Sequence, residues 1–251
     1  MSYLIAVTGK GGVGKTTLSA LMIHRLIGLG KTPVLAIDAD PNSCLDRALG
    51  VVVTGTVGKA REEVRDEAAS FASDGISKHE ALELKIAESL VESNGFDLIA
   101  MGRPEGSGCY CYANSVLKSI IGHIAKEYPY VLLDNEAGLE NLSRRIVKDV
   151  NLLILVSDAS NSGFDTLNRL YDLAVEMEIG FEKLFIVVNK IRGEKSPEKI
   201  KDIQSYTKAD MIFFINDNEE LAILAETGEP LTKLPENNEV IKVIDNIISS
   251  I

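Results

Sequence analysis

Cysteine and long apolar runs are scarce in this 251-residue chain. Its three cysteines are too few for a disulfide framework, and the chain is long enough to hold itself together by burying a core. No run of about 18 or more apolar residues occurs, so we expect no transmembrane helix. The segment from Met1 to Thr8 is a short apolar run without a basic start or a cleavage-like site, which argues against a signal peptide. We therefore expect a cytoplasmic protein.

Basic clusters are also missing. The chain has 26 Lys and Arg residues against 37 Asp and Glu residues, which gives a formal net charge of -11. An acidic chain repels nucleic-acid phosphate and anionic lipid unless a local basic patch offsets the charge. No Lys/Arg-rich run of that kind is present, so we expect neither nucleic acid nor membrane among the partners.

Short apolar runs alternate with longer segments of helical period, which predicts an α/β fold: a doubly wound, mostly parallel sheet with helices on both faces. The predicted strands are residues 3–8, 33–38, 97–101, 131–134, 152–156, 184–189 and 211–215. The predicted helices are residues 15–28, 113–127, 139–148, 166–178 and 237–250. Residues 51–94 are charged and lack a clear strand, so we interpret them as a helical insertion in a single domain spanning residues 1–251. A solvated helical face is the simplest role for that insertion.

Residues 9–17 read G-K-G-G-V-G-K-T-T and match the phosphate-loop motif G-x-x-x-x-G-K-[ST], between a predicted strand and a predicted helix. Glycines let backbone N–H groups converge on phosphate oxygens, and the helix N-terminus adds partial positive charge. We expect Lys15 to reach the β- and γ-phosphates of ATP and the Thr16 hydroxyl to ligate Mg²⁺. The predicted nucleotide contacts in this loop are Gly9, Lys10, Gly11, Gly12, Val13, Gly14, Lys15, Thr16 and Thr17.

Lys10 is an additional lysine, too far from its own γ-phosphate to be an obvious ligand within one subunit. With it, the loop resembles that of the deviant Walker A ATPases related to MinD, ParA and the nitrogenase iron protein. The resemblance implies the P-loop NTPase fold, hydrolysis of ATP to ADP and phosphate, and a homodimer with ATP between its subunits. It also implies that Lys10 acts on the partner's nucleotide and stabilises charge in the transition state. A solvated loop lysine is the alternative.

Two aspartate motifs end predicted strands at the carboxyl edge of the sheet, beside the phosphate site. Residues 36–43, A-I-D-A-D-P-N-S, match the D-x-D-P of the same family, which implies that Asp40 orients the attacking water and Asp38 supports Mg²⁺ or the switch. Residues 132–138, L-L-D-N-E-A-G, resemble the second switch, D-x-x-x-G. This implies that Asp134 holds Mg²⁺ through a water and that Gly138 lets the loop move. A helix N-cap is the competing role, above all for Asp38.

The V-V-N-K run at residues 187–190 ends a third strand, and the resemblance implies that Asn189, followed by Lys190, binds the base. GTP-using relatives continue as N-K-x-D, where the aspartate accepts hydrogen bonds from guanine. Here Arg192 occupies that position and cannot accept a hydrogen bond, so we favour ATP over GTP. The I-N-D run at residues 215–217 resembles the second wall of the base pocket, although many relatives have proline where Asn216 stands.

Cys109 and Cys111 are separated by one residue in a glycine-rich stretch. Two thiols do not readily complete a tetrahedral site, but a pair on a two-fold axis supplies four thiolates, two from each subunit. Soft sulfur ligands suit Zn²⁺, Cu⁺ and Fe–S clusters, and thiolate-bound Ni²⁺ also fits. We therefore expect a thiolate metal site shared between the subunits, with two buried small side chains as the alternative. Cys44 is interpreted as a packing residue.

With these motifs, nearly the whole chain resembles the CooC/AcsF-type accessory ATPases that insert nickel into carbon monoxide dehydrogenase or acetyl-CoA synthase. The resemblance implies that the site shared by Cys109 and Cys111 takes Ni²⁺, with Zn²⁺ as a competitor. It also implies a dimeric metallochaperone promoted by ATP and metal, with a nickel enzyme as client. One alternative is a MinD/ParA-like positioning ATPase, but Lys242 is the only basic residue after Asn237, unlike a membrane-binding basic helix. Another is an iron-protein-like Fe–S ATPase, whose family has a cysteine near the second switch where this chain has none.

Overall fold

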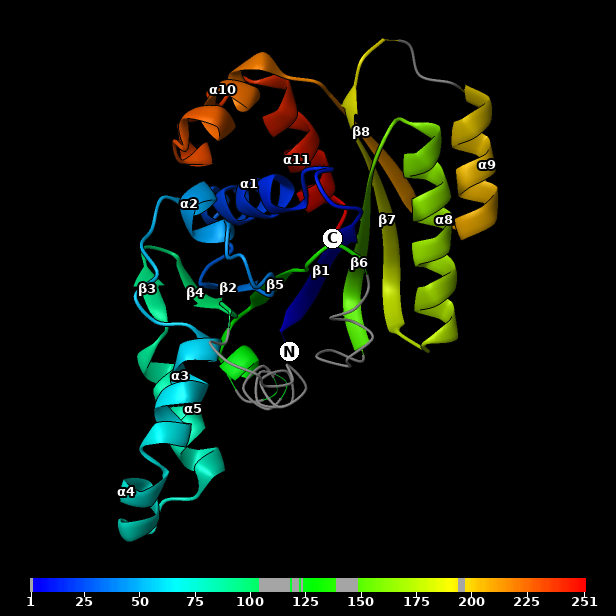
Figure 1. Cartoon of the computed structure of the whole chain (residues 1–251). Coiled ribbons are helices and arrows are strands. Elements are labelled where there is room, and N and C mark those ends of the chain that lie inside the picture. Colours follow the sequence, from blue (N-terminus) through cyan, green and yellow to red (C-terminus); the bar gives the residue numbers. More distant parts are fainter. Residues whose placement is uncertain (1, 104–117, 119–121, 123, 139–148, 194–196) are drawn as a thin grey trace.

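The computed structural model describes residues 2–103, 118, 122, 124–138, 149–193 and 197–251 (Figure 1). Within these residues, eight strands form one sheet in the order β3-β4-β2-β5-β1-β6-β7-β8. Neighbouring strands are parallel except β3 and β4. The strands are β1 (Tyr3–Gly9), β2 (Val34–Asp38), β3 (Val91–Ser93), β4 (Phe96–Ala100), β5 (Tyr130–Asp134), β6 (Asp149–Asp158), β7 (Gly180–Ile191) and β8 (Met211–Asn216).

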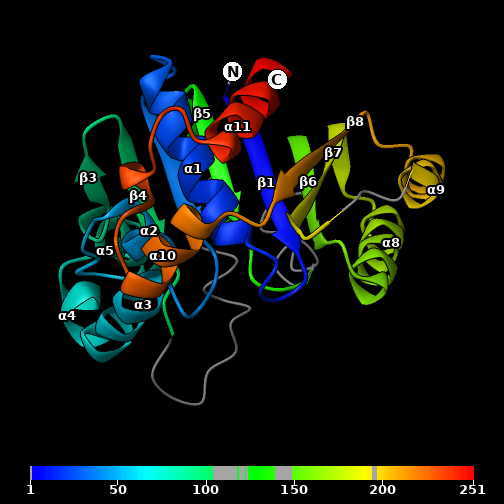
Figure 2. The ribbon, with the colours of Figure 1, turned by 90° about the horizontal axis from the view of Figure 1, so that it is seen from above.

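Helices cover both faces of this sheet (Figures 1 and 2). One face carries α1 (Lys15–Gly28), α2 (Leu45–Leu49), α10 (Glu219–Thr227) and α11 (Glu239–Ser249). The other carries α3 (Val57–Asp66), α5 (Lys78–Glu88), α8 (Asn161–Glu176) and α9 (Pro197–Thr207). The short α4 (Ala68–Ser73) lies at the far end of the α3–α5 arm, and two single turns are η1 (Ala125–Glu127) and η2 (Leu231–Lys233). The predicted doubly wound α/β fold is confirmed.

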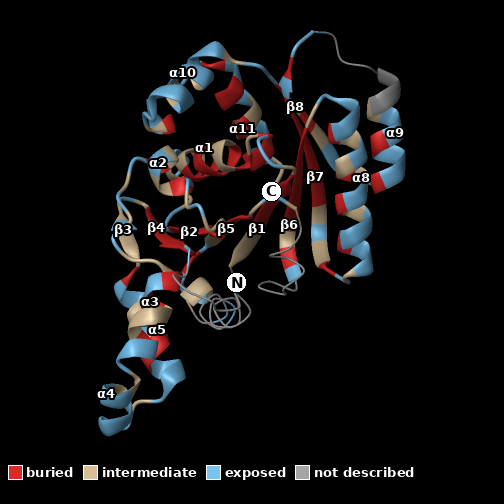
Figure 3. Ribbon diagram, in the orientation of Figure 1, coloured by how far each residue is buried: buried red, intermediate tan, exposed pale blue. Residues whose placement is uncertain are grey.

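The sequence of the central strand β1 is almost entirely apolar because both of its faces are buried. Ile5 and Val7 lie in the core beneath α1 and α11, whereas Ala6 lies in the core on the other face, and all three are fully buried. Successive strand residues point to opposite faces, so a strand covered on both sides needs apolar residues at every position. Figure 3 shows the buried residues gathered on the strands and on the helix faces turned toward them.

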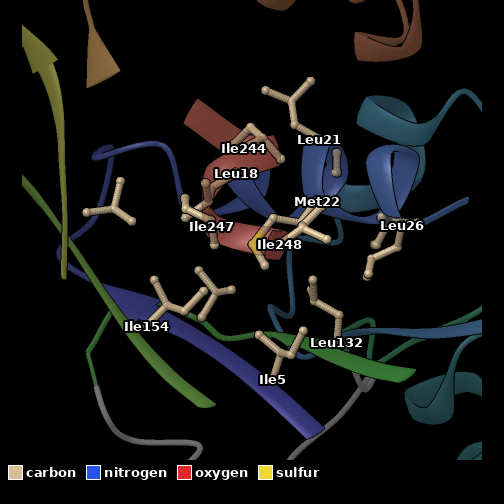
Figure 4. Packing of buried hydrophobic residues seen from close by; sticks show 14 of the residues in the cluster. Ile5, Leu18, Leu21, Met22, Leu26, Leu132, Ile154, Ile244, Ile247 and Ile248 are labelled. Carbon is tan, nitrogen blue, oxygen red and sulfur yellow. The ribbon is translucent and has the colours of Figure 1, made fainter. Parts of the chain in front are cut away.

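The C-terminal helix α11 packs its apolar face against α1 and the sheet (Figure 4). The buried residues on α11 recur at helical spacing: Val240, Ile241, Ile244, Ile247 and Ile248. The Arg25 guanidinium on α1 fixes the polar side, because its Nε donates to Oδ1 of Asp245 at 2.8 Å. This helix is therefore a structural part of the core.

Helix α1 begins and ends at Lys15 and Gly28, as the sequence predicts. Other elements extend beyond their predicted limits: α8 begins at Asn161 because the Ser160 hydroxyl caps it by accepting from the Gly163 N–H at 2.9 Å. Strands β6 and β7 are also longer than predicted. Their additional residue pairs include Asp149 with Gly180. Such polar or small residues do not fit the apolar pattern used to predict strands, although their backbones still pair.

Residues 51–94 contain α3, α4 and α5 but, contrary to the prediction, also a strand. Strand β3 has three residues and turns back on β4 through Gly95, whose φ is 87°. So short a strand leaves no periodicity to read. The prediction also missed α2, α9 and α10.

The predicted helix 113–127 is described only at residues 118, 122 and 124–127, and the predicted helix 139–148 lies wholly outside the described residues. Among the helices that the structure describes, none has the length and apolarity needed to cross a bilayer.

Truncating the α11 core contact should destabilise the protein. Ile247 is fully buried, so Ile247→Ala removes apolar contacts and leaves a cavity, and we expect a loss of about 2–5 kcal/mol in the free energy of unfolding. Ile223 on α10 is 51% exposed and provides the matched control, with an expected change within about 0.5 kcal/mol for Ile223→Ala. Urea titration followed by circular dichroism measures both, and equal losses would contradict the packing described.

Candidate active site

The loop between β1 and α1 is shaped by two glycines. A Cβ on Gly9 would lie 2.2 Å from the carbonyl oxygen of Val156 on β6, so only glycine permits this approach of the two strands. Gly14 has a φ of 96° and stands directly before α1, where a Cβ would lie 2.4 Å from Nδ2 of Asn189. The loop therefore turns back toward the helix N-terminus, the arrangement that presents backbone N–H groups to an anion.

Lys15 is the buried cation of this loop, with 8% of its surface exposed. Its Nζ donates to the carbonyl oxygen of Lys10 at 3.2 Å, which folds the side chain back over the loop. Burial lowers the pKa of Lys15, and the carboxylates of Asp134, Asp40 and Glu136 oppose that shift. These carboxylates thus favour the charged form of a buried ammonium group.

Asp134 ends β5 below the first turn of α1 and is almost completely buried. The Ser19 hydroxyl donates to its Oδ1 at 3.0 Å, whereas its Oδ2 is buried and has no hydrogen-bond partner. Burial raises the pKa of Asp134 to about 6, and the nearby Thr16 and Ser19 hydroxyls and Lys15 oppose the rise. This orphaned carboxylate oxygen beside the Thr16 hydroxyl supplies the hard oxygen donors that Mg²⁺ prefers, so these residues fit the ion.

Sequence reasoning did not identify Ser19. Its position three residues after Thr16 on α1 places both hydroxyls on one helix face, which is the signal that was available.

Asp38 ends β2 directly opposite Asp134 in the parallel pairing of β2 and β5. Its Oδ1 accepts from the Asp40 N–H at 3.1 Å and its Oδ2 from the Leu45 N–H at 3.0 Å. Burial raises the pKa of Asp38 to about 7, the two N–H bonds lower it, and the charge of Asp134 adds to the rise. In this structure both oxygens of Asp38 therefore organise the loop that leads into α2.

Asp40 stands on that loop and is held by a neighbour. Its Oδ1 accepts from the backbone and side-chain N–H groups of Asn42, at 2.8 and 2.9 Å. Asn42 in turn accepts a hydrogen bond from the guanidinium of Arg103, three residues beyond the end of β4. The chain after β4 thus contacts the loop between β2 and α2.

Gly138 ties the second switch loop to the end of β1. Its N–H donates to the Gly9 carbonyl at 3.1 Å, and its own carbonyl accepts from the Thr8 hydroxyl at 2.6 Å. Asn135 is a buried neighbour whose Nδ2 donates to the Val7 carbonyl at 3.1 Å. A movement of this loop would therefore shift the end of β1, where the phosphate loop begins.

Lys10 does not bond to the phosphate loop through its side chain. Its Nζ donates to the Ser162 hydroxyl, at 3.1 Å, on the exposed start of α8. Nearby Asp158 has a pKa below its usual range, mainly through hydrogen bonds from Ser160, with smaller contributions from the charges of Lys10 and Lys190. The additional lysine is thus separate in position and partner from Lys15.

Asn189 and Lys190 hold two successive carbonyl groups of the phosphate loop. Asn189 Nδ2 donates to the Val13 carbonyl at 2.8 Å, and Lys190 Nζ donates to the Gly12 carbonyl at 2.9 Å. Two consecutive side chains can reach one loop because the β7–β8 register shifts between Val188 and Ile191, a local bulge that re-aims side chains. This clamp on the loop is a role that the sequence motif did not predict for either residue.

A cavity of about 300 Å³ lies beside this clamp, the size of a small-ligand site. It is lined by Gly14, Thr17, Asn189, Lys190, Arg192, Asn216, Asp217, Asn218, Leu221, Ala222, Ala225 and Glu226. The cavity thus joins the end of β7, the end of β8 and one side of α10 to the phosphate loop. Asn189, Lys190 and Asn216, the residues that the sequence places around the base, all line this cavity.

Cys109 and Cys111 lie outside the described residues. Among those that are described, no group of three or more His, Cys, Asp or Glu side chains is arranged to hold a metal ion. Cys44 is exposed at the start of α2, so its interpretation as a packing residue was wrong. The adjacent Leu45 takes the buried position, because the helix begins there and turns its apolar side inward.

Replacing Gly14 should damage the site. Gly14→Ala introduces a side chain at positive φ and a clash with Asn189, so we expect the affinity for ATP to fall roughly tenfold or more. Gly28 at the other end of α1 has no such neighbour, and Gly28→Ala should leave the affinity unchanged. Titration calorimetry with ATP compares the two variants; equal affinities would rule out the clash as a constraint on the loop.

Comparison with known proteins agrees with this geometry. Residues 4–231 match the model of the CobQ/CobB/MinD/ParA nucleotide binding domain. The chain is 44% identical over 256 residues to an ATP-binding protein of Methanocaldococcus jannaschii, covering 99% of this chain and 98% of that protein. It is 32% identical over 203 residues to the carbon monoxide dehydrogenase accessory protein CooC of Rhodospirillum rubrum, covering 74% of each.

Among solved structures, a ParA family ATPase from Chlorobium tepidum covers all of both chains with a TM-score of 0.73. At 18% identity this likeness concerns the fold. The family model and the relatives above 30% identity decide membership. This chain belongs to the MinD/ParA family of P-loop nucleotide-binding proteins, the deviant Walker A family that its loop resembles.

Proposed function

We propose that this protein is a homodimeric, cytoplasmic ATPase that uses ATP hydrolysis to deliver nickel to carbon monoxide dehydrogenase or acetyl-CoA synthase. The observation that carries the proposal is the similarity to CooC together with the Cys109-x-Cys111 pair, which supplies the soft ligands that such a cargo needs. We treat residues 1–251 as one ATPase domain with a helical insertion at 51–94. In support, α3 and α5 contribute buried residues to the same core as β4.

The chemistry at the phosphates is assigned to four side chains. Lys15 binds the β- and γ-phosphates from its buried position, and Asp40, held by Asn42, orients the attacking water. Thr16 and the unpartnered Oδ2 of Asp134 would hold Mg²⁺, directly and through a water, where the ion neutralises charge on the phosphates. Asp38 keeps the loop that carries Asp40 in place through its two backbone hydrogen bonds.

The dimer completes the site in this proposal. Lys10 bonds to Ser162 at the exposed start of α8 rather than to its own phosphate loop, and it is free to exchange that weak surface contact for a partner's nucleotide. Lys10 then stabilises the charge that develops as the γ-phosphate leaves. Loss of the phosphate would then move the loop at Gly138, which bonds to Gly9, and loosen the dimer.

The cargo site is assigned to Cys109 and Cys111 of both subunits, four thiolates that take Ni²⁺, with Zn²⁺ as a competitor. Because such a site exists only in the dimer, ATP and metal favour the same assembly, and linkage makes that effect reciprocal. Hydrolysis separates the subunits and frees the metal for the client enzyme.

A MinD-like positioning role is the second candidate, since the chain is 27% identical to the septum site-determining protein MinD of Bacillus subtilis. The C-terminal helix argues against membrane binding. The apolar residues of α11 are buried against α1, so its apolar face is already occupied. An iron-protein-like Fe–S role is disfavoured because this sequence has no cysteine beside residues 134–138.

Mixing two inactive variants tests whether Lys10 acts across the dimer. Lys15→Ala should abolish hydrolysis, and Lys10→Ala should lower its rate by at least about 100-fold. An equimolar mixture should recover activity well above either variant, because a Lys10→Ala subunit keeps Lys15 and receives Lys10 from its partner. Lys183, whose Nζ donates to the Ser250 carbonyl, is the control, and Lys183→Ala should hydrolyse ATP normally. Absence of recovery would contradict action in trans, and hydrolysis surviving in Lys15→Ala would contradict the assigned site.

Anaerobic metal binding tests the cargo. With Ni²⁺ and Mg-ATP we expect about one Ni²⁺ per dimer, measured by elemental analysis and light scattering. The double variant Cys109→Ala/Cys111→Ala should lose the metal but keep hydrolysing ATP, and Cys44→Ala should keep both properties. A dimer that forms with ATP yet binds no metal would exclude the nickel role and leave the ATPase.

A further inference from the structure

An ion pair lines the cavity that is assigned to the base. The Nε of Arg192, just after β7, donates to Oδ2 of Asp217, just after β8, at 2.6 Å. The Arg192 side chain is 81% exposed and that of Asp217 37% exposed, and both residues line the cavity. This pair therefore borders the space assigned to the base.

The backbone brings these two side chains together. The Asp217 N–H donates to the Ile191 carbonyl at 3.0 Å, and Ile191 pairs with Asn216 across the two strands. The bulge before Ile191 directs Asn189 and Lys190 to the phosphate loop, while Arg192 beyond it meets Asp217. The same irregularity thus fixes both the clamp and the pair.

The chemistry of the two purines makes this pair selective. Guanine carries donors at N1 and N2 on one edge, and a free carboxylate accepts both, whereas adenine has a single donor group at N6 beside an acceptor. Asp217 is the carboxylate just after β8, but its Oδ2 accepts from the Nε of Arg192, and the rest of the guanidinium places further donors beside it. We propose that Arg192 determines base specificity by sequestering Asp217, so that the cavity selects ATP and rejects GTP.

The other polar groups of the cavity do not offer the same site. The Asn218 Oδ1 accepts from the Leu221 N–H at 3.0 Å, and Lys190 Nζ bonds to the Gly12 carbonyl. Glu226 is the remaining carboxylate of the lining and is exposed on α10, one residue before the end of that helix. It provides a matched control for Asp217.

The test measures nucleotide affinity by competition of ATP and of GTP against a fluorescent ADP analogue. The wild-type protein should prefer ATP. Arg192→Ala frees Asp217, so the affinity for GTP should rise relative to ATP by about tenfold or more, the effect of hydrogen bonds to an ionised acceptor. The double variant Arg192→Ala/Asp217→Asn should return to the wild-type ratio, and Glu226→Gln should not change it.

An unchanged ratio in Arg192→Ala would overturn the inference, as would a gain that persists in the double variant. Wild-type protein that binds GTP as tightly as ATP would do the same. The inference depends on the nucleotide-binding part of the proposed function alone, because the assay contains no nickel. If the affinity ratios change as expected but the protein binds no metal, the role of Arg192 in base specificity stands and only the metallochaperone role is excluded.

Discussion

Two buried carboxylates and one buried ammonium group set the constraint on which the site depends. The parallel pairing of β2 with β5 places Asp38 opposite Asp134 at one edge of the sheet, and α1 places Lys15 near them. Like charges in a low-dielectric interior repel, and burial alone raises the pKa of both acids. The hydroxyl of Ser19, two backbone N–H groups and Lys15 offset that repulsion. The Oδ2 of Asp134 has no hydrogen-bond partner and is therefore available to ligate a cation.

The bulge near the end of β7 connects the base cavity to the phosphate loop. Asn189 and Lys190 stand on the wall of the cavity, yet their amide and ammonium groups hold the carbonyls of Val13 and Gly12. A ligand that enters the cavity therefore meets the side chains that shape the phosphate cradle. In the proposed function, Asn189 and Lys190 would therefore link base recognition to phosphate binding.

The loop between β2 and α2 also contacts the start of the segment that leads toward the cysteines. The Met101 N–H donates to the Asp38 carbonyl at 2.8 Å, and Arg103 donates to Asn42, which holds Asp40. The chain that continues toward Cys109 and Cys111 thus leaves β4 in contact with the residues assigned to the attacking water. This contact is consistent with the proposed coupling of hydrolysis to cargo release.

Local sequence determined the parts of this protein that depend on neighbouring residues. The phosphate loop, the limits of α1 and the apolar strands follow from glycine conformations, helical spacing and two-sided burial, so each was predictable. The three-residue β3, the exposure of Cys44, the clamp by Asn189 and Lys190, and the pair of Arg192 with Asp217 were not. Strand β3 is too short to show a periodicity, and the exposure of Cys44 depends on where α2 begins. The clamp and the ion pair depend on hydrogen bonds between separate segments of the chain. Only the sheet order and the bulge in β7 bring those segments within reach, and so the tertiary structure decided them.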